Sequence, residues 1–408
     1  MSALGRVERA LAAAEEQEAL GAFWALDAER ARRAAGEMDR ARRTPRGPLA
    51  GVAVAVKDLY DVAGLPTTAG LTGAVSPARA DAELVRRLRA AGAVPIGKTA
   101  MDPLGASTGG QAPGFPACLN PLDPALSPGG SSSGSAVAVA AGMVPLALGS
   151  DTAGSARVPA AYCGIVGIKP ALGWLPRRGV VGAMPSFDAP GLLAQSVGDC
   201  AGALAVLSAR GRAPAPRGRL RVALLADLVE ESEASVAQAC AGAAALLAGE
   251  RGVEVEERRL DWRAGGFGAA LAYELAETWG DRVDADPARF TELIRSTVEF
   301  GRSRGPARYE AAMAALSAAR RSLARRFARF DAVLCPTVPV SAPDREAESV
   351  KVSTAFTRLF NALNWHALSL PAGRDRTGRP IAVQLAAPPP RLAPALAVAL
   401  RLERVLAS

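Results

Sequence analysis

Two serine-bearing turns lie close together in the chain and carry the side chains best suited to covalent chemistry. The first is the GSSSG turn at residues 130–134, and the second is the AGS turn at residues 153–155. A serine hydroxyl is a weak nucleophile until a neighbouring base takes its proton during the attack. The candidate bases are one histidine, His366, and four lysines.

Lysine is scarce in this chain, whereas arginine is abundant. Of the 48 basic residues only four are lysines: Lys57, Lys98, Lys169 and Lys351. Arginine keeps its proton in proteins, but a buried lysine can lose it. A chain so biased toward arginine is expected to keep lysine where lysine itself is required. The pairing to examine is therefore serine with lysine.

The composition indicates a globular protein with a large core. The 408 residues are 50% hydrophobic, and the net charge of +8 comes from arginines spread along helix-like segments. Because aromatic residues make up only 5% and do not alternate with the arginines, nucleic-acid binding is not favoured. The composition leaves the oligomeric state open, a homo-oligomer included.

Five cysteines and the first 20 residues help to indicate the cellular compartment of the protein. The cysteines have no CxxC spacing and no neighbouring histidine, so neither a disulfide framework nor a zinc site is indicated. The N-terminal segment is charged throughout, unlike a signal peptide, and no apolar run reaches the ~18–20 residues of a membrane-spanning helix. The sequence predicts a cytoplasmic protein with no membrane contact, no metal and no cofactor.

An early strand–helix–strand rhythm predicts an α/β sheet. Residues 52–56 form a short continuous apolar run, typical of a strand buried on both faces, and Lys57 follows at its end. Residues 81–91 are predicted as a helix with Asp81 as its N-cap, and residues 93–96 as the next strand.

The later elements predict that residues 1–408 form a single domain. Residues 1–43 carry apolar positions at helical spacing and are expected to form a helical segment on the body. The range 210–330 is predicted as a mostly helical insertion. Because residues 330–336 and 381–385 have the pattern of strands, the chain is expected to return to the same sheet.

Two local motifs suggest other chemistries, and their contexts argue against both. Residues 92–99 match the phosphate-binding loop pattern, but a helix precedes them and the loop is apolar, which fits a buried strand better. The GSSSG turn matches G-x-S-x-G, but the proline-rich residues 121–129 before it cannot form the strand of a nucleophile elbow. His366 lies in an apolar stretch and is expected to be a hydrogen-bonded structural histidine, so a Ser-His-Asp triad is the runner-up mechanism.

Three longer stretches resemble the amidase signature family. They are residues 129–132 (GGSS), 149–159 (GSDTAGSARVP) and 163–170 (CGIVGIKP). Shorter matches in the family's order extend the resemblance over most of the chain. It implies an α/β amidase signature fold, with a large mixed β-sheet core flanked by α-helices on both faces. It also implies that the insertion at 210–330 is variable and shapes the substrate pocket.

The resemblance also assigns catalytic roles residue by residue. Ser155 is implied as the nucleophile, Ser131 as a serine with a cis peptide bond that relays a proton, and Lys57 as the base. The residue types suit these roles, because Ser131 can accept a proton from Ser155 while it donates to a neutral lysine. Backbone N–H groups of the second turn are implied as the oxyanion hole: Thr152, Ala153, Gly154 and Ser155.

The second turn has further features that bear on its geometry. Ala153 departs from the glycine most common in the family and would cost ~1 kcal/mol if the position needed a positive φ. Asp151 and Arg157 are expected to support the loop as an ion pair. The remaining lysines match no family base and are expected to have structural or surface roles: Lys98, Lys169 and Lys351.

The function implied by the resemblance is hydrolysis of the carbon–nitrogen bond of a small amide. The products are a carboxylate and ammonia or an amine, formed through an acyl-enzyme on Ser155. The triple serine and the DTAGS form of the second motif look most like allophanate hydrolases. A second hypothesis is the glutaminase subunit of a tRNA-dependent amidotransferase, which would act with partner subunits. A third, a scaffold without activity, is opposed by the presence of all three catalytic residue types.

Overall fold

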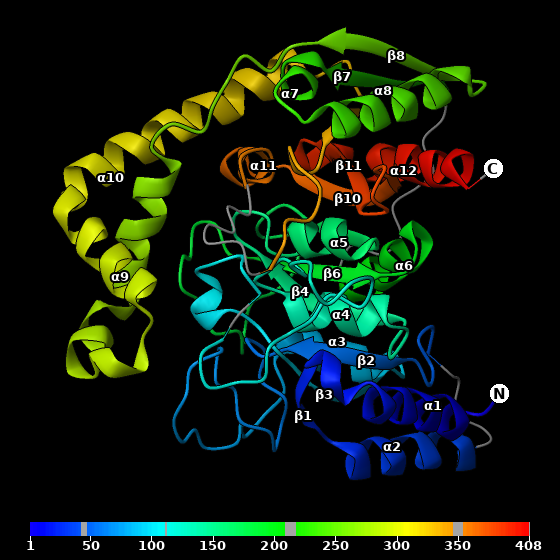
Figure 1. Ribbon diagram of the computed structural model, residues 1–408, viewed down its shortest axis with the longest axis vertical. Coiled ribbons are helices and arrows are strands. Elements are labelled where there is room, and N and C mark those ends of the chain that lie inside the picture. The colour runs from blue at the N-terminus through cyan, green and yellow to red at the C-terminus, as the bar shows by residue number, and fades with distance from the viewer. Residues whose placement is uncertain (42–46, 111, 209–217, 346–353, 408) are drawn as a thin grey trace.

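The computed structural model describes residues 1–41, 47–110, 112–208, 218–345 and 354–407. Eleven strands of these segments form one mixed sheet (Figure 1). From edge to edge the order is β1 (Phe23–Leu26), β3 (Val94–Thr99), β2 (Ala53–Lys57), β4 (Leu146–Asp151), β6 (Ala189–Ala194), β5 (Val166–Lys169), β10 (His366–Arg374), β11 (Pro380–Ala387), β9 (Ala332–Pro336), β7 (Leu220–Leu225) and β8 (Val253–Arg258). Late strands thus return to the sheet that the early strands begin.

Helices cover both faces of this sheet, because side chains of successive strand residues point to opposite sides. In β2, Val54 and Val56 pack into one core cluster, whereas Ala53 and Ala55 pack into another. The first cluster includes α3 (Glu83–Ala90), α6 (Val197–Leu207), α8 (Ala234–Gly249) and α12 (Leu392–Leu406). The second includes α1 (Ala3–Glu16), α2 (Ala28–Arg40), α4 (Ser133–Ala140) and α5 (Arg157–Cys163). The predicted fold class, a large mixed sheet with helices on both faces, is confirmed.

The far end of the sheet has its own covering helices. A third cluster packs α7 (Ala226–Glu230), α11 (Thr357–Ala362) and the end of α10 (Glu292–Arg326) against β7 and β9. Short 3₁₀ turns complete the elements: η1 (Glu18–Leu20), η2 (Pro103–Gly105), η3 (Pro287–Arg289) and η4 (Pro389–Arg391).

Two long helices, α9 (Phe267–Ala285) and α10, lie together at one side of the molecule (Figure 1). A break at Gly305, with φ 67° and ψ 167°, interrupts α10 just before Pro306. The indole N–H of Trp279 on α9 donates to the Gly182 carbonyl at 3.0 Å. The Glu274 carboxylate accepts from the Ser186 N–H at 2.9 Å. The helical pair is therefore anchored to the loop between β5 and β6.

Two of the sequence predictions need correction. The N-terminal segment is not purely helical, because β1 lies between α1 and α2 and pairs antiparallel with β3. Asp81 does not cap a helix: α3 begins at Glu83 after Ala82, without a side-chain cap. The oxygens of Asp81 accept instead from the Ala63 N–H and from Arg89, which leaves them unavailable for a cap.

Other predictions agree with the structure or fall outside it. All five cysteines are buried and free. The strand at residues 220–225 is present as β7, and β8, which the sequence did not reveal, extends the same edge. Most of the expected connector at 209–219 lies outside the described residues. Among the described helices, none is long and apolar enough to cross a membrane.

Candidate active site

Lys57 lies at the end of β2, between β3 and β4, and is completely buried. Its Nζ donates to the hydroxyls of Ser131 at 2.8 Å, Ser132 at 3.0 Å and Ser150 at 2.8 Å. Ser131 and Ser132 belong to the first turn and Ser150 to β4, so one lysine joins the turn to the sheet. The structure thus brings Lys57 and Ser131 into direct contact.

The environment of Lys57 disfavours its charged form. Burial lowers the pKa of Lys57 from 10.5 to about 7, although the carboxylates of Asp102, Asp151 and Asp188 act in the opposite direction. None of those carboxylates forms an ion pair with Lys57 in the described part of the chain, and its bonded neighbours are hydroxyls. The amine can therefore exchange a proton near neutral pH.

The first turn holds Ser131 in an unusual backbone conformation. The Gly130–Ser131 peptide bond is cis, as the resemblance implied. Gly130 packs against a buried carboxylate, since a Cβ on it would lie 2.8 Å from Asp102 Oδ1. The Ser132 N–H donates to the Ser155 carbonyl at 3.1 Å, which joins the two turns through the backbone.

The second turn connects β4 to α5 and contains the four residues predicted as an oxyanion hole. Gly154 has φ +138°, and a Cβ there would overlap Thr357 Oγ1, so the turn accepts only glycine at this position. Thr357 Oγ1 donates to the Ala153 carbonyl at 2.6 Å, which fixes the peptide between Ala153 and Gly154. Ala153 is not among the described non-glycine residues with positive φ, so the cost considered for alanine does not arise. Ser155 follows, only 2% exposed.

A buried ion pair supports the second turn. Arg157 donates to both carboxylate oxygens of Asp151, at 2.9 and 2.8 Å, and both side chains are fully buried. Burial alone would raise the pKa of Asp151, but the charge and hydrogen bonds of Arg157 outweigh burial and lower it. Arg157 also donates to Asn361 and Gln384, which ties the turn to α11 and β11. The expected ion pair is present, and Arg157 also bonds to side chains more than 200 residues away in the sequence.

Among the described residues, Lys98 and Lys169 donate to neither Ser131 nor Ser155. Lys98 Nζ is 2.7 Å from Asp58 Oδ1 in a buried ion pair, and it also donates to Thr67. Lys169 is buried at the end of β5, where it donates to the Pro170 carbonyl at 3.2 Å. Lys351 lies outside the described residues.

His366 has the hydrogen bonds of a structural histidine. Its Nδ1 accepts from the Ala171 N–H at 2.9 Å, and its Nε2 lies 2.9 Å from the Pro389 carbonyl. Both ring nitrogens are thus engaged by the backbone, on a strand that β6 and β5 separate from β4. The prediction of a hydrogen-bonded structural histidine is confirmed.

A cavity of about 270 Å³ opens beside the Lys57 group. Ser150, which Lys57 contacts, lines the cavity together with Thr152 of the second turn. Gly105 lines it as well, and a Cβ on Gly105 would lie 3.2 Å from Ser131 Oγ. The cavity therefore borders both serine turns and gives a small molecule a place next to them.

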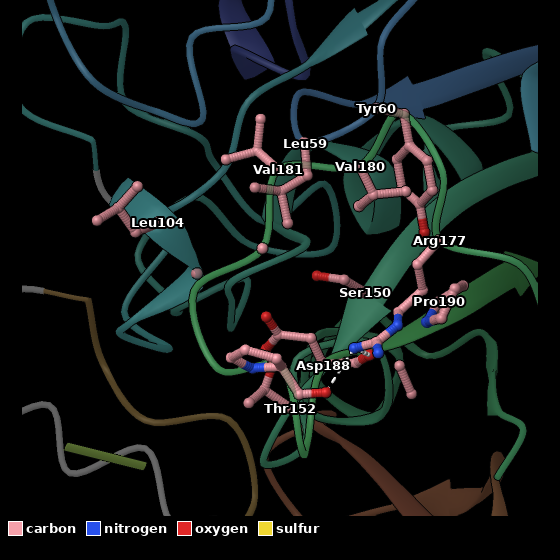
Figure 2. Close-up of a pocket in the computed structure, with 14 residues that line it drawn as sticks. Leu59, Tyr60, Leu104, Ser150, Thr152, Arg177, Val180, Val181, Asp188 and Pro190 are labelled. Carbon is pink, nitrogen blue, oxygen red and sulfur yellow. Dashed lines mark hydrogen bonds between the residues drawn. The ribbon is translucent and has the colours of Figure 1, made fainter. Parts of the chain in front are cut away.

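The walls of this cavity differ in polarity (Figure 2). Leu59, Val180 and Val181 form an apolar side, whereas Asp188 lies near Thr152 on the polar side. Asp188 accepts from the Thr152 hydroxyl at 2.7 Å, and burial raises the pKa of this carboxyl. The cavity therefore offers an apolar surface opposite hydrogen-bonding groups.

Comparisons with known proteins agree with this geometry. The family model described as Amidase matches residues 6–391. The chain belongs to the amidase family. An amidase known from its crystal structure superposes with a TM-score of 0.93 at 30% identity, over 99% of this chain and 96% of that chain.

Two relatives of the amidase chain differ in how much of their length it matches. The 2-amino-5-chloromuconic acid deaminase of Comamonas testosteroni is 34% identical over 422 aligned residues, which cover 95% of this chain and 89% of that protein. One subunit of the glutamyl-tRNA(Gln) amidotransferase of Anaeromyxobacter sp. (strain K) is 50% identical over 187 residues. That match covers 45% of this chain and 38% of the amidotransferase protein, so the chain matches well under half of its length.

Several residues of the amidase site were not identified from the sequence. Ser150 contacts Lys57 because β4 lies parallel to β2, a pairing that no local motif reveals. Thr357, Asn361 and Gln384 reach the second turn from distant elements and sit in ordinary apolar stretches. Ser150 did carry a signal, since it lies within the quoted GSDTAGS stretch next to Asp151.

Proposed function

We propose that this chain is an amidase that hydrolyses the carbon–nitrogen bond of a small amide through an acyl-enzyme on Ser155. The observation that carries the proposal is the buried Lys57, hydrogen-bonded to Ser131, with its pKa lowered to about 7. A base of this kind is what serine needs to attack an amide. Membership of a family of amide-hydrolysing enzymes agrees with it.

Lys57 acts as the base through Ser131. As Ser155 Oγ bonds to the amide carbon, its proton passes to Ser131, and the proton of Ser131 passes to the neutral amine of Lys57. A neutral amine has one lone pair and two N–H groups. In the neutral form the Lys57–Ser131 hydrogen bond is reversed, so the lone pair accepts from the Ser131 hydroxyl. The two N–H groups donate to the Ser132 and Ser150 hydroxyls at 3.0 and 2.8 Å.

The same relay, reversed, releases the amine. The proton on Lys57 returns through Ser131 to the substrate nitrogen, the carbon–nitrogen bond breaks, and an ester on Ser155 remains. Water then attacks this ester, gives its proton to the relay, and the carboxylate leaves as Ser155 recovers its hydroxyl.

Backbone N–H groups at residues 152–155 stabilise the negative oxygen of both tetrahedral intermediates. Donors fixed before the reaction contribute about 3 kcal/mol each in serine hydrolases. Two features fix this turn: the Asp151–Arg157 ion pair and the bond from Thr357 to the Ala153 carbonyl. The ion pair acts as support for the loop and does not touch the substrate.

The second candidate is the glutaminase subunit of a tRNA-dependent amidotransferase. The 50% identity over 187 residues favours it, but that match excludes more than half of this chain. The two candidate functions differ in the cofactors and partners that they require. A free amidase, which we expect to be cytoplasmic, releases ammonia from simple amides without cofactor or partner, whereas the glutaminase depends on partner subunits and charged tRNA.

The test is ammonia release by the purified chain from a panel of aliphatic amides, aryl amides, glutamine and allophanate, with Ser155→Ala as the control. We expect release from at least one small amide without ATP or partner, and no release by the variant. Release that persists in Ser155→Ala would contradict the proposal. Release only with partner subunits and tRNA would favour the second candidate.

A further inference from the structure

A second cavity, of about 570 Å³, lies next to the one beside the serine turns. Val181 lines both cavities. A hydrogen bond also joins their linings: Leu104 lines the first cavity, and its N–H donates at 2.8 Å to the carbonyl of Ala69, which lines the second. The two cavities therefore share Val181 as a wall and lie next to each other.

The second cavity differs from the first in charge. Two arginines line it, Arg282 from the end of α9 and Arg289 from η3. Asp286 also lines it, but within the segments that the structure describes it forms an ion pair with neither arginine. The ion pair near this end of α9 joins Arg302 to Asp284 instead. With two arginines and one aspartate in its lining, the cavity keeps a net charge of +1.

Arg282 is exposed, and neither guanidinium group has a hydrogen-bond acceptor among the described residues. Arg282 lies over the Trp279 ring, 4.7 Å from its centroid, and Trp279 is fixed by its bond to Gly182. Arg289 is half-buried, and its Nε is buried with no hydrogen-bond partner among the described residues. A buried guanidinium N–H without an acceptor is costly, and a carboxylate is the acceptor that its fork fits best.

We propose that the two cavities form one binding cleft for an amide that carries a carboxylate at the far end of an apolar acyl chain. The amide lies at the serine turns, the chain passes Val181, and the carboxylate binds Arg282 and Arg289. This assignment rests on the proposed amidase function. It also gives the α9–α10 pair a role, because the end of α9 and the turn that joins it to α10 supply both arginines.

The test compares two substrate series: monoamides of linear dicarboxylic acids of increasing length, and unbranched alkanamides of matched length. We expect the wild-type chain to favour the carboxylated amide at one length, with the difference mainly in KM. Arg289→Gln and Arg282→Gln should each reduce that preference, measured as a ratio of kcat/KM, by about tenfold. Val181→Trp, which narrows the junction, should remove the preference for the longer carboxylated amides.

Arg304→Gln is the matched control, because Arg304 also lies over an aromatic ring, that of Phe300, but lines neither cavity. It should keep the wild-type preference. Two outcomes would overturn this inference but not the proposed function. One is turnover of alkanamides with no increase in kcat/KM from a terminal carboxylate at any length. The other is an equal loss of kcat/KM in both series for Arg289→Gln. No turnover of any amide in either series would overturn the proposed function and the inference with it.

Discussion

Lys57 and Lys169 are two buried lysines whose pKa values are both lowered to about 7, yet their surroundings differ. Burial is the main cause for each. Around Lys57 three serine hydroxyls lie within 3.0 Å. Lys169 donates to one backbone carbonyl, and the positive charge of Arg157 lowers its pKa further. A lowered pKa alone therefore does not identify a base, since the group that gives up a proton must lie beside it.

The largest expected effect is the loss of activity in Lys57→Met. Removing a general base in contact with its relay should lower kcat/KM by about 10²–10⁴-fold. The measurement is ammonia release on the best amide of the panel. Thermal unfolding and circular dichroism of the variant serve as the control for folding. Near-wild-type turnover by a folded Lys57→Met protein would contradict the role given to this lysine.

The next effect concerns the Asp151–Arg157 ion pair, whose charges act on both lysines. Arg157→Met leaves the buried Asp151 carboxylate without its charged partner, which should destabilise the fold by about 3–5 kcal/mol. Denaturant unfolding measures this change. The double variant Asp151→Asn/Arg157→Met should recover part of the lost stability. A loss of unfolding free energy in the double variant equal to the sum of the losses in Asp151→Asn and Arg157→Met would show that the pair is not coupled.

Lys169→Met should have the smallest effect on activity, within about threefold, because the Lys169 amine donates to the Pro170 carbonyl and not to Ser131 or Ser155. Its effect should appear in the pH dependence of stability. In the unfolded chain this lysine binds a proton up to its ordinary pKa of 10.5, whereas the folded protein releases it near 7. The free energy of unfolding should therefore rise with pH between these values, and less steeply in the variant.

Unfolding curves at a series of pH values across that window measure the difference. Lys351→Met, which removes a lysine that belongs to none of the matched motifs, is the control for loss of one charge. A slope in Lys169→Met equal to that of the wild-type chain would mean that Lys169 is charged in the folded protein.

The sequence revealed the parts of this comparison that depend on local patterns. The apolar run before Lys57 predicted a buried strand end, and the two glycine–serine turns have motifs specific enough to place Ser131, Ser155, Asp151 and Arg157. The scarcity of lysine also indicated lysine as the type of residue that acts as the base. The cis bond before Ser131 came from the resemblance and not from any physical property of the sequence.

The contacts that separate the two lysines could not be predicted in the same way. Lys57 meets Ser150 only because β2 and β4 pair in parallel, and Arg157 meets Asn361 across more than 200 residues. Such pairings are set by the order of strands in the sheet. Strand β8 was missed because its VEVEER pattern is half-exposed and rich in charge, and Asp81 was misjudged as a cap because its partners are distant.

The most direct test of the central claim follows the reactivity of Ser155 against pH. The second-order rate of labelling by a fluorophosphonate probe is measured from about pH 5.5 to 9, in wild type, Lys57→Met and Lys169→Met. A neutral Lys57 is required, so the wild-type rate should rise about tenfold per pH unit below 7 and then level off. Lys169→Met should give the same curve, and Lys57→Met a slow rate with no inflection near 7. A wild-type rate independent of pH, or an inflection that disappears in Lys169→Met instead, would contradict the assignment of Lys57 as the base.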